Sequence, residues 1–213
     1  MAAQIDYQIE KYQFTAVDED PRLARQWAEV LDECRQAKAD SAERLRIALL
    51  NVDYVTSFEL PFRLLLIRAP QLIAGMRDAL TISQKSALFN DKRFGCVYSL
   101  RRELETVPDT FRYRLSTRIR RVSADGIDAS PFQQIAKETK APRERLRMAL
   151  EAGLSVTALD GLFWFGIQRI AADVLRLRKA GVPIATGETA VADNLTGTLR
   201  RVPVYRLSPR EVK

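Results

Sequence analysis

The sequence predicts a mainly α-helical protein with small β-hairpins, and three observations support that fold class. Apolar residues recur at helical spacing after Asp20-Pro21, residues 155–207 follow the order helix, turn, helix and hairpin, and one short string occurs twice. The chain has 213 residues, 46% of them hydrophobic and 29% charged, which is typical of globular proteins that bury a core. We therefore expect one large domain or two small ones.

The first expected helix begins at Asp20-Pro21, within residues 1–40, which we interpret as an N-terminal tail and helix. Five apolar residues recur there at helical spacing and form one stripe: Leu23, Trp27, Val30, Leu31 and Cys34. A single stripe of this kind usually packs against a domain core. It could also join two copies of the chain.

The repeated string is ERLRIAL at residues 43–49 and ERLRMAL at residues 144–150. At the same offset of 101, Val55-Thr56 matches Val156-Thr157. Four further identities share this offset: Phe62 with Phe163, Arg68 with Arg169, Arg77 with Arg178, and Ala79 with Ala180. Residues 97–100 (VYSL) resemble residues 204–207 (VYRL) at a slightly larger offset. This ordered series predicts an internal duplication.

The first copy is expected at residues 41–107. Its expected elements, in order, are a helix at 41–50, a helix from the N-cap Thr56 to about residue 67, a helix at 70–80 that has Pro70 in its first turn, and a hairpin of residues 81–88 and 94–100 that turns at Asn90-Asp91.

Residues 108–141 are expected to form a basic connecting segment. Within it, residues 111–122 alternate between apolar residues and arginines, which predicts one strand with an apolar and an arginine face. The arginine face would contain Arg112, Arg114, Ser116, Arg118 and Arg120. Those arginines could be solvated, or they could lie along a phosphate backbone.

Two interpretations compete for residues 130–150. They could form an independent helix-turn-helix that presents Arg143, Glu144 and Arg147, similar to a bacterial repressor pattern, although Lys140 stands where that pattern has glycine. Alternatively, residues 142–152 are the first helix of a C-terminal domain at 142–213, and residues 130–139 form a lead-in helix. We favour the second interpretation, because it also accounts for the turn at Gly166 and the hairpin after Gly181.

The C-terminal segment should contain a helix that begins at Thr157, a turn at Phe165-Gly166 and a helix at 167–179. Two β-prone runs, residues 182–186 and 201–207, then flank a polar loop. The segment resembles the winged-helix domains of phage and mobile-element proteins, whose pattern L-R-K-x-G-x-x-I is matched by Leu177, Arg178, Lys179, Gly181 and Ile184. The resemblance implies a helix and a hairpin presented to DNA. Together with the duplication it predicts tandem winged-helix domains.

The outer face of residues 167–179 supplies the first candidates for DNA contact. Gln168 and Arg169 would reach base edges, Ala172 could touch a thymine methyl group, and Arg176 and Lys179 would meet phosphates. Further candidates are on the hairpin: Arg200, Arg201 and Arg206. Secondary candidates lie before it: Arg143, Arg147, Arg118 and Arg120.

In the first copy, Gly75 stands at the place of Arg176, and Asp78 stands at that of Lys179. This copy should therefore present a less basic face than the second. It could bind a protein, or another copy of the chain, in place of DNA.

Composition narrows the class of function. The net charge is +7, from 34 Lys and Arg against 27 Asp and Glu, which permits a nucleic-acid partner. The chain has no histidine and only Cys34 and Cys96, so we expect no metal site, no cofactor and no catalytic residues. No apolar run is long enough to span a membrane, and no signal peptide is evident, so we expect a cytoplasmic protein.

The predicted function is sequence-specific binding of double-stranded DNA by a homodimer, as a transcriptional regulator of a phage, prophage or plasmid and not an enzyme. One alternative is a plasmid or phage replication initiator or partition factor. Another is a protein-interaction or assembly module built on winged helices that do not bind DNA.

Overall fold

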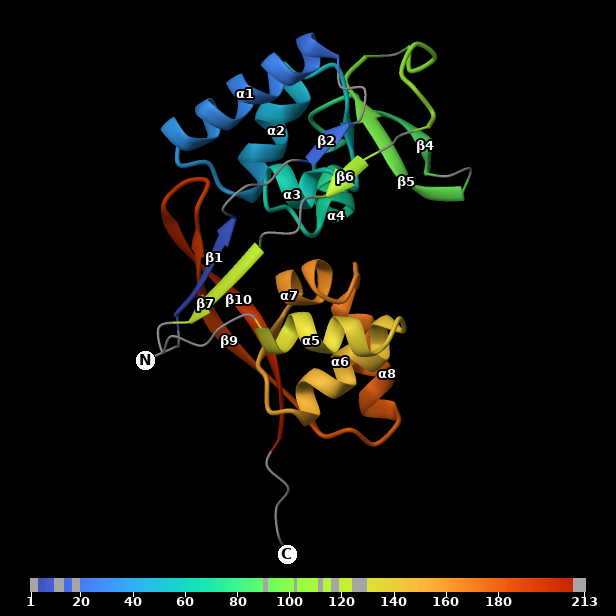
Figure 1. Ribbon diagram of the computed structural model, residues 1–213. Helices are drawn as coiled ribbons and strands as arrows, with labels where there is room; N and C mark the ends of the chain where they lie inside the picture. Colours follow the sequence, from blue (N-terminus) through green and yellow to red (C-terminus); the bar gives the residue numbers. More distant parts are fainter. Residues whose placement is uncertain are drawn as a thin grey trace, which may run out of the picture. The chain divides into compact units, whose positions relative to one another are not determined.

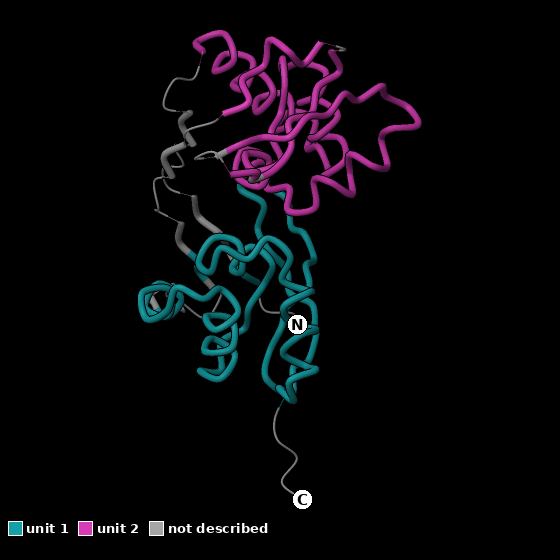
Figure 2. The backbone as a smooth tube through the Cα atoms, turned by 90° about the vertical axis from the view of Figure 1, so that its right-hand side faces the viewer, with its two compact units in different colours: residues 1–10, 119–194, 198–213 teal, residues 11–118, 195–197 magenta. Residues whose placement is uncertain are grey.

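The computed structural model describes residues 4–9, 14–16, 20–89, 92–101, 103–110, 113–115, 119–123 and 130–208 (Figure 1). The chain divides into two compact units (Figure 2). Unit 1 comprises residues 1–10, 119–194 and 198–213, and unit 2 comprises residues 11–118 and 195–197. Both units are discontinuous in sequence, which the four ranges expected from the sequence did not anticipate.

Unit 1 contains four helices and five strands among the residues that the structure describes. They are β1 (Gln4–Ile9), β7 (Ile119–Ser123), α5 (Ser130–Glu138), α6 (Pro142–Glu151), β8 (Val156–Thr157), α7 (Ala158–Phe163), α8 (Ile170–Lys179), β9 (Ile184–Asp193) and β10 (Thr198–Leu207). The sheet order is β7-β1-β9-β10-β8. Strand β1 runs antiparallel to β7 and parallel to β9. The hairpin β9–β10 is therefore part of a wider sheet (Figure 1).

The hairpin strands are longer than expected. Strands β9 and β10 each have ten residues, so most of the predicted polar loop between 186 and 201 is strand. All ten residues of β9 pair with β10, and Ala190–Ala192 pair in addition with β1 from the other end of the chain. That pairing, like the burial of Val191, has no local sequence signal.

The predicted helix at 167–179 begins three residues later, at Ile170. Gly166 has a φ of +71°, the left-handed region that glycine adopts without strain. Ile167 follows with its side chain buried and its amide donating to the Gly161 carbonyl at 2.7 Å. Residues 167–169 therefore lie between the two helices and outside both, and Arg169 is the N-cap of α8.

The prediction of a single strand at 111–122 is wrong. Strand β6 (Tyr113–Leu115) pairs with β2 (Phe14–Ala16) in unit 2, whereas β7 pairs with β1 in unit 1. In β7 the side chain of Arg121 is buried and that of Val122 is exposed, so the side expected to be apolar contains an arginine. The two strands belong to different sheets because each has its own partner strand.

Unit 2 has helices α1 (Pro21–Gln36), α2 (Ser41–Asn51), α3 (Leu60–Arg63) and α4 (Ala69–Met76), and the strands β3 (Val55–Thr56), β4 (Ser83–Phe89) and β5 (Lys92–Ser99) in the order β3-β5-β4. The helix from Thr56 ends at Arg63 instead of residue 67, since Leu65 has a φ of 55°. The helix expected at 70–80 ends at Met76. The expected turn at Asn90-Asp91 lies outside the described residues.

Helix α1 confirms the predicted apolar stripe and shows where it packs. Asp20 accepts from the Arg22 amide, which caps the helix. Leu23, Trp27, Val30 and Cys34 are buried in the core of unit 2, with Leu31 packed at its edge. Burial raises the pKa of the Cys34 thiol to about 11. Within the described structure this stripe already has a packing partner.

The two units share an order of elements: helix, two-residue strand, helix, helix and hairpin. The two-residue strands also pair in the same register. Val55 lies opposite Tyr98 and Thr56 opposite Val97, just as Val156 lies opposite Tyr205 and Thr157 opposite Val204.

Each two-residue strand is followed by the same reciprocal pair of hydrogen bonds, which caps α7 in unit 1 and lies in the turn before α3 in unit 2, where Glu59 and not the expected Thr56 is the N-cap. The Thr157 amide donates to Asp160 Oδ2 at 2.7 Å, and the Asp160 amide donates to Thr157 Oγ1 at 3.2 Å. In unit 2 the corresponding distances, between Thr56 and Glu59, are 2.6 and 3.3 Å. Each pair satisfies two amides that the helix start would otherwise leave unbonded.

Each buried capping acid lies beside an arginine that stacks on an aromatic ring. Arg121 Nε lies 3.6 Å from Asp160 Oδ1, and its guanidinium lies 4.6 Å from the Phe132 ring centroid of α5. In unit 2, Arg63 Nε lies 3.2 Å from Glu59 Oε2, and its guanidinium lies 4.7 Å from the Trp27 ring of α1. The same three-part contact thus occurs in both units with different arginines.

Candidate nucleic-acid interface

Helix α8 has one buried and one exposed side. Ile170, Val174 and Leu177 are buried and attach the helix to unit 1. The sequence candidates lie mainly on the other side: Gln168, Arg169, Arg176 and Lys179 are exposed, and Ala172 is half-buried. Gln168 and Arg169 precede the first turn of the helix, so they stand at its N-terminal end.

Helix α7 packs closely against the start of α8. A Cβ atom added at Gly161 would lie 3.0 Å from Ile170 Cδ1, tighter than an ordinary contact. At the offset of 101, the counterparts of Gly161 and Ile170 in unit 2 are Leu60 and Ala69, both buried. The larger side chain at this crossing is therefore Ile170 of α8 in unit 1, and Leu60 of α3 in unit 2.

Asp173 joins two of the candidate arginines. Its Oδ1 lies 3.1 Å from Arg143 Nε at the start of α6 and 3.4 Å from Arg176 Nη1. The Asp173 side chain is largely shielded, whereas both arginines are half-exposed or more. Asp173 thus holds two guanidinium groups from different helices at one place on the surface, and partly neutralises them.

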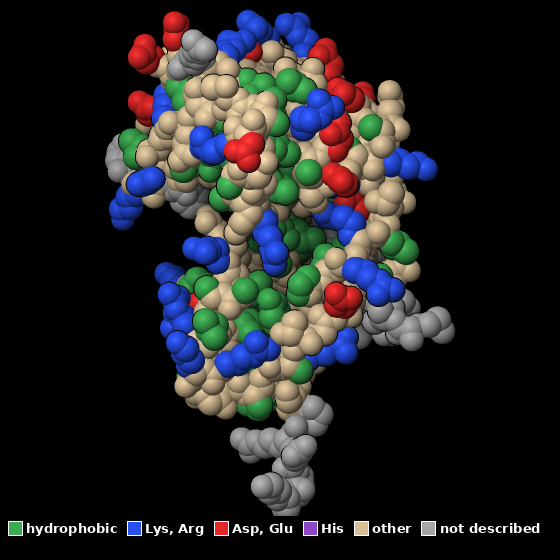
Figure 3. Space-filling model, turned by 180° about the vertical axis from the view of Figure 1, so that it is seen from behind, with side chains coloured by type: hydrophobic (Ala, Val, Ile, Leu, Met, Phe, Trp, Pro, Cys, Tyr) green, Lys and Arg blue, Asp and Glu red, His purple; other side chains and the backbone are tan. Residues whose placement is uncertain are grey.

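For three other candidates the structure describes no acidic neighbour that would offset the positive charge. Among the residues that the structure describes, none places a carboxylate within 4.0 Å of Arg169, Lys179 or Arg206, all of which are exposed. Figure 3 shows that Lys and Arg predominate over Asp and Glu on one face of unit 1. A surface of this kind attracts polyanions.

The hairpin arginines differ in availability. Arg200 Nε lies 2.8 Å from the fully buried Oδ2 of Asp193, so an acid of the same hairpin largely neutralises its charge. The Arg201 side chain is 81% exposed and lies 3.9 Å from Glu188, and Arg206 is exposed. Arg178 donates to the Ile184 carbonyl at 2.7 Å and to Thr186 Oγ1 at 2.8 Å, which ties the end of α8 to the hairpin.

Arg77 makes the matching contacts in unit 2. It donates to the Ile82 carbonyl at 3.1 Å and to Gln84 Oε1 at 2.8 Å. The end of α4 is therefore tied to the β4–β5 hairpin in the same way as α8 is tied to β9.

The secondary candidates are not brought together by the structure. Arg147 bonds to Glu144 and, at 2.6 Å, to Glu151 along α6, and its guanidinium holds the pKa of the Glu144 carboxyl below its usual range. Arg120 lies in β7, and Arg118 lies outside the described residues. Only Arg143 joins the primary candidates, through Asp173.

Leu175 and Ala171 are exposed on α8 and were missed by the sequence-based face. The signal was present, since at 100° per residue Leu175 lies about 140° around the helix from Ile170.

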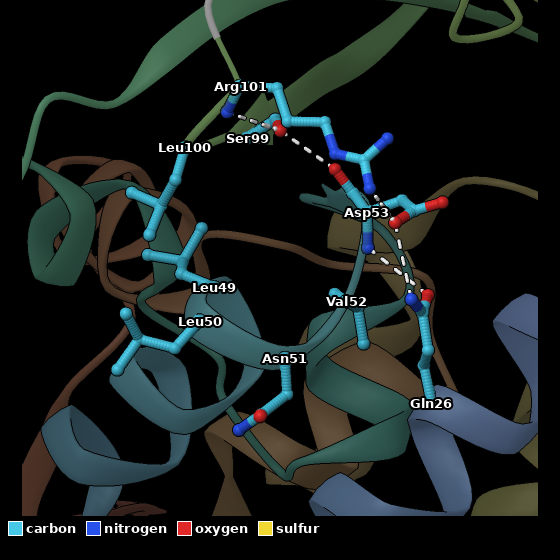
Figure 4. A pocket seen from close by; sticks show the side chains of 9 residues that line it. All are labelled: Gln26, Leu49, Leu50, Asn51, Val52, Asp53, Ser99, Leu100 and Arg101. Carbon is cyan, nitrogen blue, oxygen red and sulfur yellow. Dashed lines mark hydrogen bonds and ion pairs between the residues drawn. The ribbon is translucent and has the colours of Figure 1, made fainter.

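A pocket of about 290 Å³ in unit 2 is lined by nine residues: Gln26, Leu49, Leu50, Asn51, Val52, Asp53, Ser99, Leu100 and Arg101 (Figure 4). The Asp53 carboxylate accepts from Gln26 Nε2 at 3.2 Å and from Arg101, and the Asp53 carbonyl accepts from Ser99 Oγ at 2.7 Å. These bonds tie α1 and the end of β5 to the loop after α2, so the polar groups serve the fold.

Neither a metal-binding cluster nor a membrane-spanning helix occurs in the described part of the chain. It contains no group of three or more Cys, Asp or Glu side chains that could hold a metal ion. None of its helices combines the length and apolar character that crossing a membrane requires.

Residues 142–210 match the family model of the winged helix-turn-helix domain, which confirms the resemblance predicted for the C-terminal third. The match begins with α6 and includes β10, in agreement with α6 as the first helix of the domain. No curated protein and no solved structure matches the chain. The winged helix-turn-helix is a DNA-binding fold, so this domain supports DNA as the partner of unit 1.

Proposed function

We propose that the protein binds double-stranded DNA sequence-specifically, with α8 as the recognition helix and β9–β10 as the wing. The carrying observation is the exposed side of α8, where Arg169 and Lys179 have no described carboxylate partner while the opposite side is buried in the domain. No catalytic residue enters this proposal.

The candidates would divide the work by position. Gln168 and Arg169, at the N-terminal end of α8, would donate to base edges in the major groove. Arg176 and Lys179 would meet phosphates, and Asp173 would orient Arg143 and Arg176 toward the same strand. Arg201 and Arg206 on the wing would contact the adjacent DNA backbone. Arg200 would act mainly within the wing, through its ion pair with Asp193.

We also propose that the chain contains two winged-helix domains, within residues 41–107 and 142–213. This is supported by the shared strand register, the reciprocal caps and the arginines that tie each third helix to its hairpin. The segments around them, 1–40 and 108–141, would supply the flanking helices α1 and α5 and the added strands.

Where the second and third helices of each proposed domain cross, the small and the large side chain have exchanged places: Gly161 and Ile170 in unit 1 correspond to Leu60 and Ala69 in unit 2. This exchange gives a test of the duplication. Gly161→Leu should destabilise the protein by about 1–3 kcal/mol through overpacking, and Ile170→Ala should destabilise it by about 2–5 kcal/mol. Because Leu60 and Ala69 occupy the counterpart positions, the double variant should lose at least about 1 kcal/mol less than the sum. Urea unfolding measures all three.

Gly161→Leu combined with Val191→Ala, a buried residue of β9, is the control and should be additive. Additivity of the Gly161 and Ile170 changes as well would contradict the proposed equivalence of the two crossings.

Unit 2 carries the observation that favours a second function. The exposed side of α4 has Gln71, Ala74 and Gly75, and Asp78 follows the helix. Its cations among the described residues are Arg68 at the N-cap and Arg77 at the C-cap, and Arg77 is bonded to Ile82 and Gln84. A surface this neutral suits a protein partner better than a phosphate backbone, so unit 2 could serve assembly while unit 1 binds DNA.

Selection of bound duplexes from a random pool tests the proposed function. We expect one enriched sequence, bound with an affinity that falls steeply with salt. A symmetric sequence would support a homodimeric transcriptional regulator, for which the phage, prophage or plasmid setting rests on the sequence resemblance alone. Direct repeats would favour a replication initiator or partition factor. No enrichment, together with one stoichiometric protein partner, would replace DNA binding by the assembly function.

A further inference from the structure

Leu175 is 54% exposed, although it lies within the helix proposed to enter DNA. The core side of α8 is complete without it, since Ile170, Val174 and Leu177 are all buried. One turn earlier, at i−4, Ala171 is also exposed. Residues four apart are neighbours on a helix surface, so the two side chains form a short apolar strip.

The strip has charged surroundings. Arg176 is adjacent in sequence, and Lys179 lies one turn beyond Leu175 on the same side. Lys179 has no carboxylate partner among the described residues, and Arg176 is paired only with Asp173, at 3.4 Å. An apolar strip beside cations suits a surface that is mostly anionic but carries an isolated apolar group.

The major groove of DNA is such a surface. Its apolar feature is the 5-methyl group of thymine, which lies among hydrogen-bonding base edges and is flanked by phosphates. The counterparts of Ala171 and Leu175 in α4 are Pro70 and Ala74, so only unit 1 presents a leucine at this place. A protein partner is less well matched, since the cations beside the strip would need acidic groups spaced to meet them.

We propose that Leu175, supported by Ala171, contacts the 5-methyl group of a thymine and is a specificity-determining residue of the interface. The inference rests on α8 being the recognition helix. It adds an apolar contact to the polar contacts of Gln168 and Arg169, and it places that contact one turn further along the helix than Ala172 would.

Substitution of deoxyuridine for thymine tests the contact, because it removes the methyl group and keeps base pairing. In the duplex selected by the wild type, each thymine is replaced in turn, and binding is measured by fluorescence anisotropy. At one position we expect the wild type to bind roughly 4-fold more weakly, the value of one buried methyl group. Leu175→Ala should bind the thymine duplex about that much more weakly and show no further loss with deoxyuridine at that position.

Leu199→Ala removes a leucine of β10 that is 63% exposed and is the matched control; it should keep the wild-type response to deoxyuridine. Thermal unfolding of both variants should match the wild type, since both side chains face solvent. A full thymine preference in Leu175→Ala would overturn the inference and leave the proposed function standing. The same would follow if Leu175→Ala changed only the oligomeric state on size exclusion. Failure of the wild type to select any duplex would overturn both.

Discussion

Replacing Arg169 and Lys179 together by alanine should weaken binding to the selected duplex by about 100-fold or more. Arg169 would no longer make a bidentate contact to a base, worth roughly 1–3 kcal/mol, and Lys179 would no longer neutralise a phosphate. Because neither side chain has a carboxylate partner among the described residues, thermal unfolding should be unchanged. Anisotropy titrations at several salt concentrations should show a salt slope reduced by about 0.9 for each phosphate that the variant leaves without a cation.

The matched control removes the same charge from arginines that are already paired. Arg35 and Arg46 are exposed and bond to Asp32 and Glu43 in unit 2. Arg35→Ala with Arg46→Ala lowers the net charge equally, and it should change the affinity only slightly. Equal losses in both double variants would mean that net charge, and not the face of α8, governs binding.

Asp160→Ala should destabilise the protein by about 3–5 kcal/mol, the range found when one partner of a buried ion pair is removed. Asp160 is fully buried, caps α7 through Thr157 and faces the shielded guanidinium of Arg121. The substitution removes both the cap and the counter-charge, and it leaves the buried Arg121 guanidinium on the Phe132 ring without its ion-pair partner. Urea unfolding followed by circular dichroism measures the change in the free energy of unfolding.

Two further variants serve as controls for Asp160→Ala. Arg121→Met in the Asp160→Ala background should restore part of the stability, because no unpaired charge then remains buried. Glu144→Ala, which removes an exposed acid of α6, should cost far less. A loss below about 1 kcal/mol for Asp160→Ala would show that neither the cap nor the ion pair contributes as its burial implies.

Much of the local structure could be predicted from neighbouring residues. Asp20 before Pro21, and Thr157 three residues before Asp160, are signals that act within one turn, and both helices begin where these residues place them. The buried side of α8 followed from the spacing of Ile170, Val174 and Leu177. The match of residues 142–210 to a winged helix-turn-helix domain has the same local origin, since its pattern lies within contiguous elements.

The prediction was poorer wherever a partner came from far along the chain. The pairing of β9 with β1 joins distant parts of the chain, and the division of residues 111–122 depends on β2 and β1, because a strand ends where its hydrogen-bonding neighbour ends. The pairing of Arg200 with Asp193 and of Arg143 with Asp173 likewise appears only once the elements pack.

For the candidate interface, the sequence by itself determined which residues lie opposite the buried stripe of α8, because helical periodicity requires only the chain in that segment. It also determined that Arg169 and Lys179 are cations there. Packing of distant elements was needed to show that Arg143 and Arg200 have acidic partners. The physical reason is that charge and exposure at a surface depend on which distant groups are packed within a few ångströms, and no local pattern encodes that distance.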